Sequence, residues 1–358
     1  MVASSSSSAC WLFASSLLAL AGCEPLASSP PERTAPPPEP TAGPPCLAQT
    51  RPILAHAGML GRPQLLAMDA TGSLSIALNR GSFVYGSTWS PDGRTIALRR
   101  RVDSAGLDSL ATTELLLFSP DDSDEEVVLL TDSAPQVDGI SRRHPDGASW
   151  SPDGHRLVFA SLRDSDHYRI WLMARSGGQA QLLLPELEPV VQLYPRWSPR
   201  DAERVAYIAE SDGQADLWLA DLVSGRRERL TSGEMAALES PRWSPEGERL
   251  TFSALPRDRP PEQAHYDIYL LDLGTRERRQ ITENAGNNFD PAWSPDGTSL
   301  LISSTREFGD DGGVPRADLW RVWLDGDRAP EPLIRGVRGA STLEADWYGF
   351  AECSSSGG

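Results

Sequence analysis

A five-residue motif, Trp-Ser-Pro-Asp-Gly, occurs three times in this sequence, at residues 89–93, 150–154 and 293–297. Near-copies begin at Trp197 and Trp243, and a sixth tryptophan, Trp347, follows an acidic lead-in. The gaps between these six tryptophans are 61, 47, 46, 50 and 54 residues. A repeat of this length is one supersecondary unit, into which about four strands fit. The chain is therefore predicted to stack several copies of a small sheet.

One repeat shows how the unit is expected to fold. After Trp243, residues 245–247 supply the Pro and Gly of a turn, and residues 249–252 alternate polar and apolar side chains as a half-buried strand does. Residues 267–272 and 279–282 are predicted as the third and fourth strands. Second and third strands of the other repeats are predicted at residues 95–98 and 115–118, 157–160 and 170–173, 205–208 and 217–219, and 300–303 and 319–322. Because four such strands cannot bury both faces alone, we expect the tryptophans to pack between neighbouring sheets.

This pattern resembles the WD40-like Trp-Ser-Pro-Asp-Gly repeat of TolB-type β-propellers, and the resemblance covers roughly residues 51–353. It implies an all-β fold: a six-bladed β-propeller with four-stranded antiparallel blades. The resemblance is to the propeller only, because a short Pro-rich stretch stands here where TolB carries an α/β domain ahead of its propeller.

Closure of the ring is expected to use both ends of the chain. Five complete repeats start at the first five tryptophans, whereas the sixth has only its first strand, at residues 345–350. The three missing strands are predicted at residues 52–57, 64–68 and 74–78. The N-terminal strands and the C-terminal strand would then share one blade.

Two of the four cysteines flank this junction. Cys46 precedes the predicted second strand of the last blade, and Cys353 follows its first strand, where other blades have the covalent Pro-Asp-Gly turn. In an oxidising compartment, a Cys46–Cys353 disulfide would replace that turn. The alternatives are two free buried thiols, or a free Cys46 in a linker.

The first residues of the chain resemble a bacterial lipoprotein leader. Residues 11–22 are an apolar run too short to span a membrane, and the run ends in Leu20-Ala21-Gly22-Cys23, which is similar to a lipobox. The resemblance implies a signal peptide over residues 1–22 and a lipid on Cys23. Since Glu24 follows, it also implies the outer membrane, on its periplasmic side or at the cell surface. The alternative is an ordinary secretory leader cut near Ala27.

Composition divides the rest of the chain. Residues 23–50 are rich in Pro, Ser, Ala and Thr and are predicted to be a disordered tether, followed by the propeller at 51–353 and a disordered tail at 354–358. The formal net charge is −17, and every basic side chain is Arg. Phosphate binding needs a basic stripe, so nucleic acid is an unfavourable partner. The only membrane contact expected is through the lipid.

The sequence shows no familiar catalytic spacing. It has five histidines but no His-x-x-x-His, Cys-x-x-Cys or Gly-x-Ser-x-Gly pattern, so we expect no cofactor, no metal and no enzymatic activity. Asp216, Asp267 and Asp318, each just before a third strand, are expected to make structural hydrogen bonds. Side chains on or just before the innermost strands are the candidates for a binding site at the channel mouth: His144, Asp146, Tyr194, Glu239, Asp290 and Glu344.

These observations favour a lipid-anchored, monomeric envelope module. Its rim loops and channel mouth are expected to bind a protein or an envelope polymer. Two alternatives remain open. One is a polysaccharide lyase-like or carbohydrate-binding propeller with a metal site in the channel, and the other is a purely structural envelope component.

Overall fold

The computed structural model describes residues 47–59, 62–72, 75–78, 83–102, 111–120, 125–134, 147–163, 167–184, 191–260, 263–283, 286–305, 316–338 and 345–348. All of them belong to one compact unit, residues 43–358. The described elements are one short helix and 24 strands in six four-stranded sheets. Every strand pairing is antiparallel, so the predicted six-bladed, all-β architecture is confirmed.

The blades follow one another along the chain. Blade 1 contains β4 (Phe83–Trp89), β5 (Ile96–Arg101), β6 (Ala111–Ser119) and β7 (Glu125–Ala134). Blade 2 contains β8 (Ser149–Trp150), β9 (Arg156–Ser161), β10 (Arg169–Ala174) and β11 (Gln181–Leu182). Blade 3 contains β12 (Val191–Trp197), β13 (Arg204–Ser211), β14 (Gln214–Asp221) and β15 (Arg227–Arg229).

The second half of the ring repeats this order. Blade 4 contains β16 (Met235–Trp243), β17 (Arg249–Pro256), β18 (Asp267–Asp272) and β19 (Arg278–Gln280). Blade 5 contains β20 (Asn288–Trp293), β21 (Ser299–Ser304), β22 (Arg316–Trp323) and β23 (Glu331–Arg338). Blade 6 contains β24 (Ala345–Trp347), β1 (Ile53–Met59), β2 (Arg62–Met68) and β3 (Ser75–Ala77).

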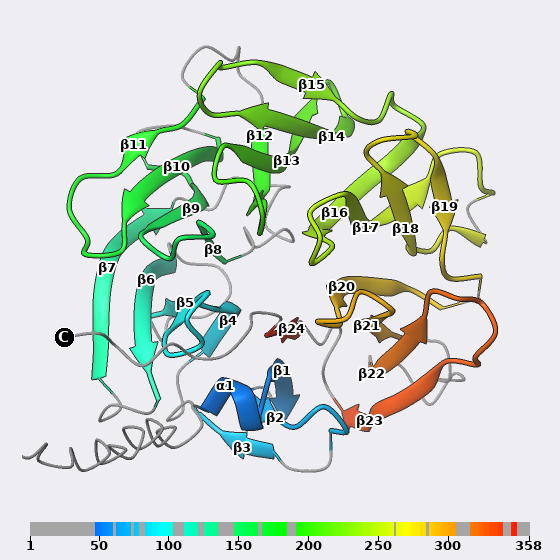
Figure 1. The fold of residues 1–358 in the computed structure, drawn as a ribbon, viewed down its shortest axis with the longest axis horizontal. Coiled ribbons are helices and arrows are strands. Elements are labelled where there is room, and N and C mark those ends of the chain that lie inside the picture. The colour runs from blue at the N-terminus through cyan, green and yellow to red at the C-terminus, as the bar shows by residue number, and fades with distance from the viewer. Residues whose placement is uncertain are drawn as a thin grey trace, which may run out of the picture. The chain divides into compact units, whose positions relative to one another are not determined.

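Blade 6 closes the ring with both ends of the described chain. Its strand order is β24-β1-β2-β3, and Ile53 pairs with Trp347 across the junction. Figure 1 shows β24 beside β1, near the centre of the circle of blades. The closure by one C-terminal and three N-terminal strands is therefore confirmed.

The Ser-Pro-Asp-Gly part of the motif builds the turn between the first two strands of a blade. In blade 5, the Ser294 hydroxyl donates to Asp296 and accepts the backbone N–H of Ser299, at 2.6 and 3.0 Å. Gly297 donates its N–H to the Ser294 carbonyl at 2.9 Å and has a φ of 68°, which glycine adopts without strain. These residues recur because the turn needs them.

The tryptophans are buried between blades, as predicted. The indole N–H groups of Trp150, Trp243 and Trp293 donate to backbone carbonyls of the preceding blade, at 3.4, 2.9 and 3.3 Å. Arginines of one blade also lie over tryptophan rings of the next, as Arg249 does 4.7 Å from the ring centre of Trp293. These three tryptophans therefore both pack the core and hold the first strand of the preceding blade, whereas Trp197 donates to Ala202 of its own blade at 3.0 Å.

The expected hydrogen bonds of the repeated aspartates are confirmed in two blades. Thr231 donates its hydroxyl to buried Asp216, and Thr282 donates to buried Asp267, each at 2.8 Å. Both threonines follow the fourth strand of the same blade, so this bond ties the end of that strand to the start of the third. Asp318, the equivalent residue of blade 5, is also buried.

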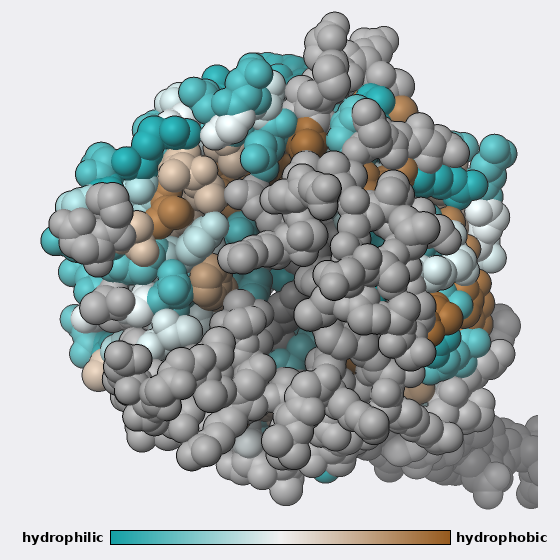
Figure 2. Space-filling view, turned by 180° about the vertical axis from the view of Figure 1, so that it is seen from behind, coloured by the Kyte–Doolittle hydropathy of each residue, from teal (hydrophilic) through white to brown (hydrophobic). Residues whose placement is uncertain are grey.

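The start of the packed unit differs from the predicted boundary. Leu47–Thr50 forms one turn of helix, α1, and Ala48 is fully buried, although the tether was predicted to extend to residue 50. Within the described residues, no helix has the length and apolar character to cross a membrane. Only four large hydrophobic side chains of the described chain are exposed, namely Val102, Val127, Val128 and Val223. Figure 2 accordingly shows mostly hydrophilic residues along much of the described outer rim.

Candidate functional site

The first strands of four blades share an irregularity close to the repeated tryptophan. Their pairing with the second strand shifts between residues 85 and 88, 193 and 196, 239 and 242, and 289 and 292. The residue three places before the tryptophan has a positive φ in each of them: Gly86, Tyr194, Ser240 and Asp290, at 59°, 53°, 50° and 50°. Such bulges re-aim the side chains that follow them.

In blade 2 the equivalent residue is Gly147. A β-carbon there would lie 1.7 Å from the carbonyl oxygen of Gly86, so only glycine allows the first strands of blades 1 and 2 to approach this closely.

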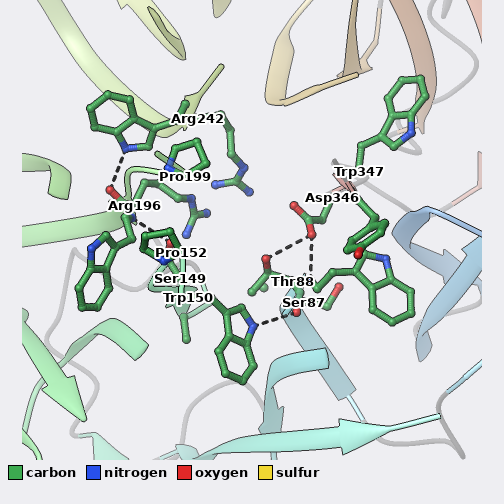
Figure 3. A pocket seen from close by; sticks show the side chains of 16 residues that line it. Ser87, Thr88, Ser149, Trp150, Pro152, Arg196, Pro199, Arg242, Asp346 and Trp347 are labelled. Carbon is green, nitrogen blue, oxygen red and sulfur yellow. Dashed lines mark hydrogen bonds between the residues drawn. The ribbon is translucent and has the colours of Figure 1, made fainter. Parts of the chain in front are cut away.

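The side chains immediately before the tryptophans meet around one cavity of about 140 Å³. We name it the central cavity and define it by five residues from five blades: Thr88, Ser149, Arg196, Arg242 and Asp346. Figure 3 shows the two guanidinium groups and the Asp346 carboxylate directed toward the same space. The ring thus gathers polar side chains that lie up to 258 residues apart in the sequence, as Thr88 and Asp346 do.

Asp346 is held by the neighbouring blade. Its Oδ2 accepts the backbone N–H of Trp89 at 3.0 Å and the hydroxyl of Thr88 at 3.2 Å. Burial raises the pKa of Asp346 above its ordinary value, although these two donors and the Arg242 charge oppose that shift. The carboxyl group is therefore positioned rigidly, and its other oxygen is turned toward the arginines (Figure 3).

The two arginines occupy the same place in adjacent blades. Arg196 is buried and Arg242 is half-buried, and each donates to the carbonyl of the proline before it, at 3.3 and 3.4 Å. The backbone carbonyls of both arginines accept an indole N–H from the next blade. The tryptophan contacts thus fix the strand positions from which both guanidinium groups extend.

Ser149 adds a hydroxyl group to the same wall. Its Oγ accepts the backbone N–H of Trp197 at 2.9 Å. A hydroxyl group can also donate one hydrogen bond, and that proton has no acceptor among the described residues. Guanidinium and hydroxyl groups therefore line the central cavity together.

Three of the residues predicted for the channel mouth lie elsewhere on the inner strands. Asp290 accepts the hydroxyl of Ser240 at 2.5 Å, and burial, assisted by the Glu239 charge, raises the pKa of Asp290. Glu239 accepts the phenol of Tyr266 at 3.0 Å. Tyr194 is buried at its bulge, and none of the predicted three lines the central cavity.

The other predicted positions lie outside the described residues. They are His144, Asp146 and Glu344 at the channel mouth, Cys23 at the anchor, and Cys46 and Cys353 at the ring junction. Within the described ranges, no three His, Cys, Asp or Glu side chains are close enough together to hold a metal ion.

Sequence reasoning missed Arg196 and Arg242, although a signal was present. The tryptophan is present in all six repeats and the serine in five of them, but the residue before the tryptophan is Thr, Ser, Arg, Arg, Ala and Asp in the six blades. A position that varies beside a constant packing residue indicates that its side chain is not needed for packing between the blades.

The fold and this cavity place the protein among the six-bladed β-propellers, whose innermost strands surround a common axis. More narrowly, the propeller is similar to those of the TolB type. Residues 163–312 match the family described as "TolB beta propeller domain". The crystal structure of TolB from Acinetobacter baumannii superposes with a TM-score of 0.63 at 18% identity, covering 82% of this chain and 66% of that one.

Two curated relatives align with part of the chain. The "Tol-Pal system protein TolB" of Gluconobacter oxydans is 29% identical over 140 residues, which is 39% of this chain and 26% of the relative. The "Uncharacterized peptidase YuxL" of Bacillus subtilis is 26% identical over 166 residues, which is 46% of this chain and 22% of the relative. The alignments thus span about a quarter of the length of these relatives.

The expectation that the chain is not an enzyme is corrected by these comparisons. One relative is named a peptidase, and oligogalacturonate lyase from Vibrio parahaemolyticus has the same fold, with a TM-score of 0.50, 14% identity and coverage of 73% of this chain and 72% of that one. The expectation of no enzymatic activity was wrong because it was based only on the spacing of catalytic motifs along the sequence. A propeller brings together residues from different blades, so its sites need no local motif.

Proposed function

We propose that this protein is a binding module of the bacterial envelope that captures a partner protein at the central cavity and the surrounding rim loops. One observation carries the proposal: polar side chains from five blades converge on one cavity, held by hydrogen bonds between blades. A rigid frame with convergent polar groups is the usual form of a binding site. The relative whose name assigns it to a Tol-Pal system supports a role in an assembly of proteins.

The envelope location rests on the sequence. The apolar run at residues 11–22 and the Leu-Ala-Gly-Cys motif that ends at Cys23 support export and lipid attachment. In the proposal the lipid holds the protein at the outer membrane, and the Pro-rich stretch at residues 24–45 separates the propeller from the lipid surface.

Crosslinking from native membranes tests the binding role. The wild-type protein and an Arg196→Gln/Arg242→Gln variant are crosslinked in membranes, purified and compared by mass spectrometry. The wild type is expected to capture a partner that the double variant captures at least tenfold less. Arg226→Gln is the matched control, because Arg226 is an exposed arginine outside the cavity. Equal capture by all three proteins would contradict the proposal.

A second candidate function is catalysis on a uronate polymer. Burial raises the pKa of two carboxyl groups, Asp290 and Asp346. The positive charge of Arg242 acts on both of them and opposes this shift. Shifted carboxyl groups beside an arginine are typical of acid–base sites. The test is turnover of oligogalacturonate with and without added divalent metal, followed through the ultraviolet absorbance of the unsaturated product. Turnover that Asp290→Asn abolishes would favour this candidate, and no turnover under any condition would eliminate it.

A further inference from the structure

We infer that the outer edge of blade 1 binds an extended segment of another protein, which pairs with β7 as a fifth antiparallel strand of the blade. The segment carries two neighbouring apolar residues followed by a basic residue. This surface lies outside the central cavity, because no residue of β7 lines that cavity. The inference therefore goes beyond the proposed function and does not depend on it.

β7 differs from the outermost strands of the other blades. Four of these, β3, β11, β15 and β19, have only two or three residues. β23 has eight residues, but it contains Pro332 and its pairing shifts twice. Short strands, proline and bulges are the features that protect a sheet edge from pairing with another chain. β7 has ten residues and no proline, so its edge is the least protected of the six.

The first four residues of β7, Glu125–Val128, form the segment that we name the β7 edge. They pair with β6 without interruption, and the only shift of register in β7 follows them, at Leu129. Among the described residues, no strand pairs with the outer side of β7 (Figure 1). Alternate residues of an edge strand direct their N–H and C=O groups away from the sheet. The β7 edge can therefore extend its hydrogen-bond ladder to a further strand.

The side chains of the β7 edge are apolar where a strand would cover them. Val127 and Val128 are 45% and 44% exposed, and they are the only two neighbours among the four exposed large hydrophobic residues of the described chain. Adjacent residues of a strand point to opposite faces of the sheet. An added strand would therefore cover both valines if it placed one apolar residue beside each.

A cleft of about 600 Å³ lies beside Val127, between blades 1 and 2. Blade 1 contributes Leu117 and Val127, which pair with each other across β6 and β7, and blade 2 contributes His155 and Arg175. The outermost strand of blade 2, β11, has two residues where β7 has ten, so blade 2 covers only part of the face that β7 presents to it. The residue of an added strand opposite Val127 would enter this cleft.

The cleft favours an apolar side chain over an anionic one. Arg175 is its arginine, and that guanidinium group already donates to the Asp92 carboxylate at 3.1 Å and to the Thr95 hydroxyl at 2.7 Å. The charge of Arg175 is therefore paired, while Leu117 and Val127 offer an apolar wall. Recognition by strand addition commonly combines main-chain hydrogen bonds with a pocket of this kind for one side chain.

The charge at the start of β7 favours a basic residue in the partner. Arg100 donates to both Glu126 and Glu114, at 2.5 and 2.7 Å, so one guanidinium group serves two carboxylates, and Glu126 is still 47% exposed. In antiparallel pairing, the partner residue opposite Glu126 follows the residues opposite Val128 and Val127. The order in the partner is therefore apolar, apolar, basic. A second copy of this chain is a poorer occupant, because it brings the same net charge of −17.

A short peptide tests strand addition to the full-length protein. The probe is a fluorescein-labelled peptide of sequence Thr-Val-Ile-Arg-Thr, and its binding is measured by fluorescence anisotropy. Two further peptides are N-methylated, one at Val and the other at Ile, so that each blocks one of the two alternate sets of hydrogen bonds. One of these peptides should bind at least tenfold more weakly than the probe, and the other should lose less affinity, since its N–H points away from β7.

Variants assign the binding to the β7 edge. Val127→Ser should weaken the probe about fivefold, because it removes apolar contact at the cleft. Val223→Ser is the matched control, since Val223 is a 75% exposed valine of blade 3, and it should leave the affinity unchanged. Glu126→Arg should weaken the probe and strengthen binding of Thr-Val-Ile-Glu-Thr, whereas Glu203→Arg, at an exposed glutamate of blade 3, should change neither.

Four results would each overturn the inference. They are no binding of the probe, equal affinity of the unmodified peptide and both N-methylated peptides, equal weakening by Val127→Ser and Val223→Ser, and a wild-type dimer in sedimentation that Val127→Ser dissociates. The first two use only the wild-type protein, so they hold even if a variant does not fold. The dimer would assign the β7 edge to a second copy of the chain. Arg196→Gln/Arg242→Gln should bind the probe as the wild type does, which separates this test from capture at the central cavity.

Discussion

At the scale of single residues, the repeat separates positions that build the fold from positions that carry chemistry. The serine, aspartate and glycine of the motif form the turn, and the tryptophan donates to the neighbouring blade. The residue before the tryptophan takes no part in that turn. In the described blades it is Thr88, Ser149, Arg196, Arg242, Ala292 or Asp346, and all but Ala292 line the central cavity. Changes at this one position alter the chemistry of the cavity while the motif that builds each turn stays the same.

His56 gives the first prediction at this scale. Its Nε2 lies 2.8 Å from the Ser87 hydroxyl and 3.2 Å from the Ser87 backbone nitrogen, across the junction between blades 6 and 1. Because a backbone N–H can only donate, Nε2 accepts, and the neutral ring carries its proton on Nδ1. Burial lowers the pKa of His56 from 6.5 to about 4.

A lowered histidine pKa makes stability fall on acidification. Between the two pKa values the unfolded chain binds a proton that the folded chain does not, so the contribution of His56 is complete above pH 6.5 and is lost as the pH falls toward about 4. The loss amounts to about 3 kcal/mol. Urea unfolding of His56→Gln should lack this part of the pH dependence, whereas His155→Gln, which alters an exposed turn, should retain it. Identical pH profiles of both variants would contradict the prediction.

At the scale of secondary-structure elements, the aspartate–threonine contact gives the second prediction. In blade 4, Thr282 donates to buried Asp267 at 2.8 Å and accepts the N–H of Ile268 at 3.0 Å. Thr282→Val keeps the shape of the side chain but removes one hydrogen-bond partner from the Asp267 carboxylate and one from the Ile268 backbone N–H. This loss should lower the free energy of unfolding by about 1–3 kcal/mol. The control is Thr275→Val, in an exposed turn, which should cost less than about 0.5 kcal/mol by denaturant unfolding. An equal loss of unfolding free energy in the two variants would indicate that the Thr282–Asp267 hydrogen bond does not stabilise the blade.

The strands could be predicted from the sequence, but the bulges and the central cavity could not. Alternation and turn residues depend on neighbours along the chain, so residues 249–252 and 267–272 were recognised and fall within β17 and β18. The bulge at Asp290 depends on how β20, the first strand of blade 5, packs against the neighbouring blade. The pattern of residues along one strand does not predict this packing. The channel residues were therefore predicted three to six places before the tryptophan, whereas the residues that line the cavity stand directly before it.

At the scale of the whole molecule, both chain ends are expected to carry covalent modifications. The lipid proposed on Cys23 gives the third prediction. Cys23→Ser should move the protein from the membrane fraction to the soluble fraction, because it removes the thiol that would carry the lipid, and mass spectrometry of the wild type should show the acylated N-terminus. Cys10→Ser is the matched control, since Cys10 lies before the motif and should leave the protein in the membrane fraction. A wild-type protein that is soluble and carries no lipid would contradict the proposal.

The ring junction gives the last prediction, a disulfide between Cys46 and Cys353. Tyr348 donates its backbone N–H to the Pro52 carbonyl at 2.8 Å, so the two chain ends run side by side there. Cys46 precedes Pro52 by six residues, and Cys353 follows Tyr348 by five. Blade 6 lacks the covalent turn that joins the first two strands elsewhere, and β24 pairs with β1 over only three residues.

A bond between these cysteines would close the ring, and by the chain-entropy estimate such a long loop contributes on the order of 5 kcal/mol. Non-reducing peptide mapping of protein exported to an oxidising compartment should recover one crosslinked peptide. A reducing agent should lower the melting temperature of the wild type toward that of Cys353→Ala and leave the variant unchanged. Recovery of both thiols free, or equal melting temperatures with and without reductant, would show that hydrogen bonds and packing alone hold β24 in the ring.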